Sequence, residues 1–275
     1  MLPETQSRPR VLVVGGGLAG MAAALELAVR ARVRVIERLP AMGGTWGFEH
    51  PRARELAAAC QRSDVELTAG LTALRWRDGR LLVAGPGQVA WLPADYLVFA
   101  GGTRPSHAAE LGVGGSRLAG VFTATVAHHL LEAEIVLGRR FVVAGWGDWA
   151  ELIVPQLLPL GQVTVVGGTR HDELPWPGVR WWPGYRTVSV HGESRVDRLE
   201  VTDGVARHFV RCDCVIFAGE PRPLRNVDGA NREDADRASF IQPTAAGLGP
   251  DAVIDYARKA AAAVQLDRPA EDEPR

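Results

Sequence analysis

The spacing of three glycines near the N-terminus indicates a site for nucleotide phosphates. Gly15, Gly17 and Gly20 form the pattern G-x-G-x-x-G, with Leu18 and Ala19 before the last glycine. The apolar run 11–14 predicts a strand before the pattern, and 21–29 predicts a helix after it. Such a strand–turn–helix directs the free N–H groups at the start of the helix toward a pyrophosphate. The alternative is a glycine-rich turn that serves packing alone.

A carboxylate stands where such a site needs one. The run 33–36 predicts a second strand, and Glu37 follows it directly, about 20 residues beyond the glycines. A carboxylate at this point accepts hydrogen bonds from ribose hydroxyls and repels a 2′-phosphate. We therefore expect a dinucleotide with an unphosphorylated ribose at this first turn, and we include Arg38 in the same site.

A second, weaker glycine pattern occurs in the middle of the chain. Gly145, Gly147 and Ala150 lie between a predicted strand at 141–144 and a predicted helix at 151–158. Alanine is an accepted third residue of the pattern. The order of elements therefore predicts a second nucleotide-binding turn.

The residues around this second turn leave its ligand open. Asp148 and Trp149 complete the turn, and the bulky Trp146 separates its two glycines. No acid ends the next predicted strand, 163–166, whereas Arg170 would favour a 2′-phosphate and hence NADPH. The alternatives are a degenerate turn without a nucleotide and a turn that holds ATP or ADP.

Other reactive residue types carry less information. Because adjacent helical residues point to different faces, His128 and His129 are expected to be structural or surface residues, and no metal ligand is assigned. Cys60, Cys212 and Cys214 form no C-x-x-C pair. Cys212 and Cys214 are expected to be buried thiols, and a redox role is the alternative. Alternation along a strand would place Cys212 and Cys214 on one face, where a disulfide between them is geometrically poor.

The elements that position these turns occur twice in the same order. Each half predicts a strand, a glycine turn, a helix, a strand, an antiparallel meander and a final strand that ends in glycine. The meanders span 65–92 and 179–210, and the final strands span 96–100 and 215–218. The fold class is therefore α/β, with two Rossmann-like units that each carry a small antiparallel meander.

Composition excludes several classes of partner. The 275 residues include 31 basic and 32 acidic side chains, so no strong field attracts nucleic acid. No apolar run is long enough to span a bilayer, and the first ten residues lack the apolar core of a secretory signal. Three cysteines indicate a reducing compartment, so we expect a cytoplasmic protein.

Five segments together resemble the FAD-dependent pyridine nucleotide-disulfide oxidoreductase class. They are 11–37, 43–44, 95–105, 145–150 and 213–219. The resemblance implies that a unit for NAD(P)H is inserted in a unit for FAD. The expected boundaries are 1–117 for the first part of the FAD-binding domain, 118–219 for the NAD(P)-type domain, and 220–275 for the C-terminal part of the FAD-binding domain with a charged tail.

The resemblance also implies further cofactor contacts in three loops and one strand end. For FAD they are Gly44, Thr45 and Trp46, then Ala100, Gly101 and Gly102, and finally Gly247 before the last helix. For NAD(P)H, Gly219 joins the residues of the second glycine turn.

Within the class, segments 120–124 and 138–145 are most similar to one branch. That branch contains the flavoprotein subunits of heteromeric amine and amino-acid oxidases and dehydrogenases, among them sarcosine oxidase α, opine oxidase, hydrogen cyanide synthase and dye-linked proline dehydrogenase. The resemblance implies a second oxidoreductase subunit as partner, or a homo-oligomer. The cluster of Trp176, Trp181 and Trp182 is interpreted as a docking patch or as local core.

Two departures from the class narrow the expected function. Trp46 stands where the disulfide reductases have a cysteine, and segment 246–250 lacks the usual acid. We therefore expect an FAD-dependent oxidoreductase, or a subunit of one, that passes electrons between NAD(P)H, FAD and a further acceptor or partner chain without a redox-active disulfide. No catalytic acid or base is identified. One alternative is a non-catalytic nucleotide-binding subunit of a heteromeric dehydrogenase. A less favoured alternative is a flavin monooxygenase, because segment 43–46 resembles a motif of that class.

Overall fold

Each glycine-rich turn begins a separate α/β unit. The computed structural model describes residues 8–266 except 48, 117, 170–172, 174, 225–236 and 242–248. The chain leaves the first unit after Thr103, forms the second unit from Arg104 to Arg222, and returns to the first at Pro223. The short strands β8 (Thr103–Pro105) and β18 (Pro221–Pro223), where the chain crosses, pair with each other.

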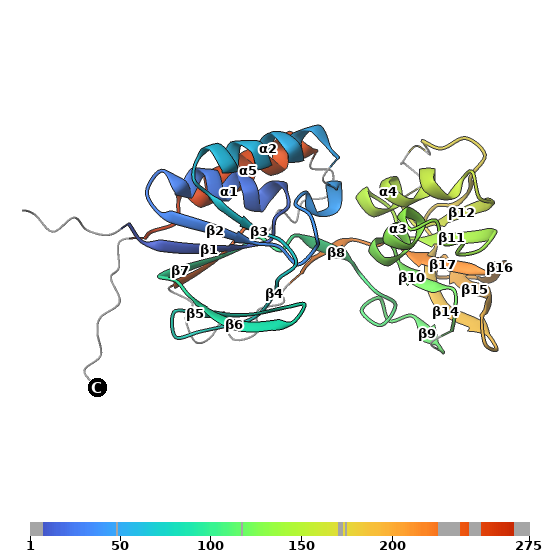
Figure 1. Ribbon diagram of the computed structural model, residues 1–275. Coiled ribbons are helices and arrows are strands. Elements are labelled where there is room, and N and C mark those ends of the chain that lie inside the picture. The colour runs from blue at the N-terminus through green and yellow to red at the C-terminus, as the bar shows by residue number, and fades with distance from the viewer. Residues whose placement is uncertain are drawn as a thin grey trace, which may run out of the picture. The chain divides into compact units, whose positions relative to one another are not determined.

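A five-stranded parallel sheet forms the centre of the first unit. Its order is β19 (Ala238–Phe240), β7 (Tyr96–Phe99), β1 (Arg10–Val14), β2 (Arg32–Ile36) and β3 (Glu66–Thr68). One face packs on helices α1 (Leu18–Ala28), α2 (Pro51–Arg62) and α5 (Pro250–Ala262) (Figure 1). The other face packs on a meander of β4 (Thr72–Arg77), β5 (Arg80–Gly85) and β6 (Gln88–Pro93).

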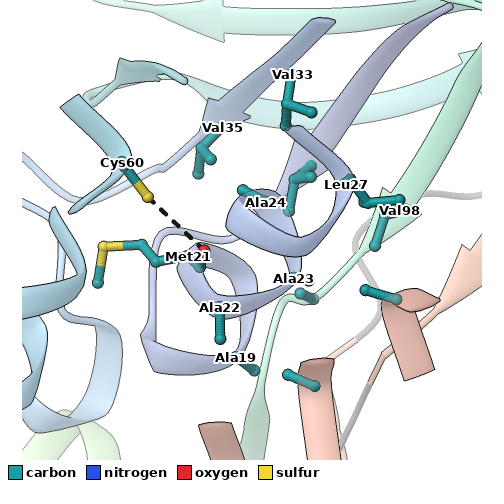
Figure 2. Packing of buried hydrophobic residues seen from close by; sticks show 14 of the residues in the cluster. Ala19, Met21, Ala22, Ala23, Ala24, Leu27, Val33, Val35, Cys60 and Val98 are labelled. Carbon is teal, nitrogen blue, oxygen red and sulfur yellow. Dashed lines mark hydrogen bonds between the residues drawn. The ribbon is translucent and has the colours of Figure 1, made fainter. Parts of the chain in front are cut away.

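Alternation along the buried strands explains why both faces are covered. Val11 and Val13 of β1 belong to the core beneath the helices, whereas Leu12 and Val14 belong to the core beneath the meander. Consecutive apolar residues are what a parallel strand buried on both faces requires. Figure 2 shows the helical side, where the small side chains of the alanine-rich α1 lie among Val33, Val35 and Val98.

The second unit repeats this plan. Its sheet has the order β10 (Val121–Thr123), β17 (Cys214–Phe217), β11 (Arg140–Ala144), β12 (Gln162–Val166) and β13 (Arg180–Trp182). Helices α3 (Ala124–Glu132) and α4 (Asp148–Leu157) cover one face. The other face packs on a second sheet that contains β14 (Arg186–Gly192) and β15 (Val196–Thr202). In this sheet β15 also pairs with β16 (Arg207–Arg211), and β14 also pairs with β9 (Gly114–Gly115).

The unit boundaries differ from the expected ones. The first crossing lies between residues 103 and 104 instead of 117 and 118, and the second lies between 222 and 223 instead of 219 and 220. Residues 104–116 belong to the second unit because β9 pairs with β14, and because Ala108 and Val113 pack on the core beneath β15. This segment carries no strong strand or helix pattern of its own, so its contacts alone assign it.

The expectation that Cys212 and Cys214 share a face is wrong. Cys214 lies in the core beneath α3 and α4, whereas Cys212 lies in the core on the meander side. Strand β17 begins only at Cys214, and the chain bends at Asp213. The bend breaks the alternation that the sequence argument assumed. Both thiols are buried, as expected.

Candidate nucleotide-binding site

The first glycine turn is shaped by close contacts between backbone segments. A Cβ on Gly15 would lie 2.2 Å from the carbonyl oxygen of Ala100, and a Cβ on Gly20 would lie 1.8 Å from the carbonyl oxygen of Gly15. Neither position has room for a side chain, so both glycines serve the joint between β1, β7 and α1. Gly17 differs, because its nearest neighbour would be the Cα of Gly44 at 3.7 Å. Gly17 therefore leaves room for a ligand to approach the backbone.

The N-terminus of α1 begins at this open glycine. Gly17 is the residue before the helix, and no side chain caps it. The first N–H groups of a helix have no acceptor within the helix, and they carry its partial positive charge. No acidic residue stands in the first turn of α1. The predicted contacts at Leu18 and Ala19 are therefore backbone N–H groups, because both side chains are buried in the core.

Glu37 is held against the same turn. Its Oε2 accepts a hydrogen bond from the N–H of Gly16 at 2.6 Å, and its Oε1 accepts one from the N–H of Leu39 at 2.7 Å. The residue is only 5% exposed. Each carboxylate oxygen can accept a second hydrogen bond, so the pair retains capacity for two ribose hydroxyls. Arg38, beside it, is exposed.

The loop after β2 also reaches the turn. The N–H of Gly43 donates to the carbonyl of Gly16 at 2.8 Å, and Gly43 pairs with Gly17 in an isolated bridge. Gly44, Thr45 and Trp46 form a short 3-10 helix, which brings Gly44 next to Gly17. The Trp46 side chain is 43% exposed, so it is available to a ligand or partner.

The end of β7 completes the first site. The N–H of Ala100 donates to the carbonyl of Val14 at 2.8 Å, which continues the β1–β7 pairing up to the glycine turn. A Cβ on Gly101 would lie 2.6 Å from the ring of Phe99, and Gly102 has a φ of +76°. The predicted residues 100–102 therefore lie at the same sheet edge as Gly15 and Glu37. Gly247 lies outside the described residues.

The second turn reproduces the backbone of the first. The N–H of Gly145 donates to Val166 O at 2.8 Å, as that of Gly15 donates to Ile36 O at 2.8 Å. A Cβ on Gly145 would lie 2.3 Å from the carbonyl group of Ala218, which matches the approach of Gly15 to Ala100. Gly147 precedes α4 without a side-chain cap. Gly219 follows Ala218 at this sheet edge, with Leu111 Cδ1 at 3.7 Å from the position of a Cβ.

The side chains of the second turn are different. Trp146 takes the place of Gly16, and Gly167 takes the place of Glu37, so no carboxylate ends β12. The Trp146 ring stacks on Trp181, with centroids 5.1 Å apart and planes 22° apart. Trp181 Nε1 in turn donates to the carbonyl oxygen of Gly167 at 3.0 Å. Aromatic rings therefore stand beside the strand end that would present a ribose-binding acid.

The three remaining predicted residues of the second turn, Trp149, Asp148 and Arg170, differ in where they lie. Trp149 is 5% exposed and packs in the core beneath α4, so its ring does not line the turn. Asp148 is the first residue of α4 and is partly exposed. Arg170 lies outside the described residues. The predicted site residues did not include Gly16 and Gly43, although the N–H of Gly16 donates to Glu37 and the N–H of Gly43 donates to Gly16. Contacts between distant backbone atoms leave no pattern along the chain.

The three cysteine side chains are buried, and none of them is a reactive thiolate at neutral pH. The Cys60 thiol lies 3.7 Å from the carbonyl of Met21 in the helical core (Figure 2). Burial raises the pKa of Cys60 to about 11, and it raises the pKa of Cys212 and of Cys214 to about 12. At neutral pH each therefore remains a protonated, unreactive thiol.

Comparison with known proteins agrees with this architecture. Residues 2–128 match the family model "Pyridine nucleotide-disulphide oxidoreductase". No curated protein matches the chain. Within the described residues, no helix is long and apolar enough to cross a membrane.

Solved structures share the two-unit fold. Thioredoxin reductase from Lactococcus lactis has 14% identity and a TM-score of 0.65, over 92% of this chain and 96% of that one. L-proline dehydrogenase from P. horikoshii has 19% identity and a TM-score of 0.64, over 92% of this chain and 54% of that one. NAD-dependent persulfide reductase from A. fulgidus has 18% identity and a TM-score of 0.64, over 92% and 58%. The chain thus spans little more than half of the last two.

The matched segment contains β1, the glycine turn, Glu37 and the end of β7, which are the parts that build the first site. The match to the pyridine nucleotide-disulphide oxidoreductase model therefore covers the residues that build the first site, and the whole chain has the two-unit α/β fold of these solved structures.

Proposed function

We propose that this chain is an FAD-dependent oxidoreductase, or the flavoprotein subunit of one, that passes electrons between NAD(P)H, FAD and a further acceptor or partner chain. The observation that carries the proposal is the Glu37 carboxylate, fixed by the N–H of Gly16 beside the uncapped start of α1. Phosphates and a ribose are recognised by this combination of a helix N-terminus and a carboxylate.

The residues of the first unit fit an FAD dinucleotide. The N–H groups at the start of α1 would hold the pyrophosphate, and Glu37 would accept hydrogen bonds from the adenosine ribose. Residues 44–46 and 100–102 would lie along the remainder of the cofactor, because both segments reach the same turn. When bound, FAD would supply the redox chemistry itself, namely hydride acceptance and onward electron transfer.

The thiols support a reaction without a redox-active disulfide. Residues 43–46 contain no cysteine, and the three cysteines of the chain are buried with raised pKa values. A disulfide reductase needs a thiolate that its substrate can reach. Electrons would therefore leave FAD for an acceptor outside this chain.

The side chains of the second turn favour a second candidate function, namely a non-catalytic nucleotide-binding subunit of a heteromeric dehydrogenase. The matched family model ends at residue 128, before the second turn, and its description names pyridine nucleotides, which favours NAD(P)H over ATP or ADP as the nucleotide of the chain. However, the Trp146–Trp181 stack and the missing carboxylate at Gly167 weaken the second turn as a ribose site. In the second candidate, a partner chain oxidises an amine or amino acid, and this chain binds nucleotides without using NAD(P)H.

The outer face of the meander in the first unit is suited to such a partner. Trp91 pairs with Leu82 and Val89 pairs with Ala84 across β5 and β6. Trp91 is 45% exposed and Val89 is 71% exposed. Exposed apolar side chains that gather on one sheet face are typical of protein interfaces.

An anaerobic visible spectrum tests the proposal. Purified protein should show flavin bands, and these should bleach on addition of NADH or NADPH if the second turn works. Dithionite is the control, because it reduces bound flavin without a nucleotide site. Bands that bleach with dithionite alone would favour the second candidate. Protein that lacks flavin bands and does not acquire them after incubation with FAD would contradict the proposed function.

A further inference from the structure

Two histidines and a glutamate gather at the C-terminal end of α3. His128 Nε2 lies 3.3 Å from Oε1 of Glu132, and His129 Nδ1 lies 3.2 Å from its Oε2. The ligand atoms of the three residues all lie within 4.8 Å of one another. The adjacent histidines start on different sides of the helix, but Glu132 follows them by four and three residues and so reaches both rings.

Hydrogen bonds fix which nitrogen of His128 carries the proton. Gln156 of α4 donates from Nε2 to the carbonyl of Leu152 at 2.6 Å, so its Oε1 is the atom that faces His128 Nδ1 at 3.0 Å. An amide oxygen only accepts, so Nδ1 of His128 must donate. In the neutral ring, Nε2 therefore presents a lone pair.

This lone pair faces a carboxylate oxygen, and two acceptors in contact require a cation between them. The cation is either a proton on the imidazole or a metal ion. A metal-binding histidine characteristically donates its other N–H to a neighbouring acceptor, as His128 does to Gln156. The side chain of His128 is only 16% exposed, which holds the ring in place, whereas those of His129 and Glu132 are about half exposed and open to an incoming ion.

Distance and ligand type point to a transition metal. Tetrahedral zinc with bonds of about 2.0–2.1 Å places its ligands about 3.4 Å apart, close to the two observed histidine–glutamate separations. Imidazole with carboxylate suits zinc and its first-row neighbours, whereas magnesium and calcium prefer all-oxygen sites. The helix C-terminus adds a partial negative charge that favours a cation. We propose that His128, His129 and Glu132 form a zinc-type divalent metal site, with water in the open position.

The chain contains a matched pair of residues that should not bind metal. His107 Nε2 lies 3.5 Å from Oε2 of Glu110, again with a spacing of three residues. There, however, the Glu110 N–H donates to Nδ1 of His107, so the neutral ring carries its proton on Nε2 and donates to the carboxylate. Arg104 also donates to both oxygens of Glu110. Neither group needs a further cation.

Calorimetric titration of tag-free, full-length protein with Zn²⁺ at pH 7.5 tests the site. We expect one high-affinity ion per chain, an affinity at least about tenfold lower in Glu132→Gln and in Gln156→Ala, and no change in His107→Asn. Zn²⁺ should also raise the Tm of the wild type but not of Glu132→Gln. Circular dichroism would establish that each variant is folded. We expect Glu132→Gln to fold, because the Glu132 side chain is exposed.

Three results would overturn the proposal. The first is undiminished Zn²⁺ affinity in Glu132→Gln. The second is an equal loss in His107→Asn, which would mean that histidines bind zinc nonspecifically. The third is the absence of Zn²⁺ binding to the folded wild-type protein. None of these outcomes bears on whether the first unit binds FAD.

Discussion

The substitution Glu37→Gln separates the two roles of this carboxylate. The wild-type side chain accepts one hydrogen bond on each oxygen, from the N–H groups of Gly16 and Leu39. A glutamine keeps one carbonyl oxygen and turns an amide NH₂ group toward the other backbone N–H. One N–H group in a buried environment then has no acceptor, which costs about 1–3 kcal/mol of the free energy of unfolding.

The same change removes charge from the proposed ribose contact. A hydrogen bond to a charged acceptor contributes about 1.5–3 kcal/mol, so its weakening should raise the Kd for FAD on the order of 10- to 100-fold. Urea unfolding of FAD-free protein measures the first effect, and fluorescence titration with FAD measures the second. Both assays use the same preparation, so the two effects can be compared directly.

Glu66→Gln is the control, because it makes the same chemical change on the neighbouring strand. Glu66 is 60% exposed and pairs with Arg34 at 3.0 Å, and an exposed ion pair contributes at most about 1 kcal/mol. We expect a small loss of stability and an unchanged Kd. If Glu37→Gln behaved like this control in both assays, the reasoning would be refuted. A loss of stability with an unchanged Kd would make Glu37 a structural residue only.

Three further predictions follow from the same contacts. Gly20→Ala should prevent the first unit from folding, because its Cβ would lie 1.8 Å from Gly15 O, whereas Gly70→Ala, with φ +77° and no neighbour within 4 Å, should cost only about 1–2 kcal/mol in urea unfolding. Hydrogen bonds from Ser189, His191 and Arg207 lower the pKa of Glu200 to about 2, so this group stabilises the fold above its unfolded pKa of about 4.3, and that contribution is lost as the pH falls toward 2. The Tm should therefore fall less steeply over this pH range in Glu200→Gln than in wild type, and parallel Tm curves would contradict the assignment. Ellman's reagent at pH 8 should label none of the three buried cysteines until the protein is unfolded, and rapid labelling of the native protein would reopen thiol chemistry.

The sequence alone determined the parts of this protein that depend on local pattern. Gly15, Gly20 and Gly145 mark turns where a strand meets a helix, and the apolar runs beside them predict the strands that are found. The repeated order of elements predicted two α/β units, and the structure and its similarity to solved structures confirm that fold. The absence of cysteine from segment 43–46 is also visible in the sequence alone, because recognising it requires no knowledge of tertiary contacts.

Tertiary structure decided what the side chains of the two turns do. The sequence placed Glu37 near the glycines but not on the N–H of Gly16, and it noted Trp146 but not its stack on Trp181. It also placed a domain boundary at 117, whereas the pairing of β9 with β14 joins residues 104–116 to the second unit. It expected His128 and His129 to point to different faces of the helix, and only the structure shows that Glu132 contacts both rings. These contacts join side chains and backbone groups whose meeting depends on rotamers and loop paths. Periodicity records only which way a residue faces, so it leaves such contacts to the packed fold.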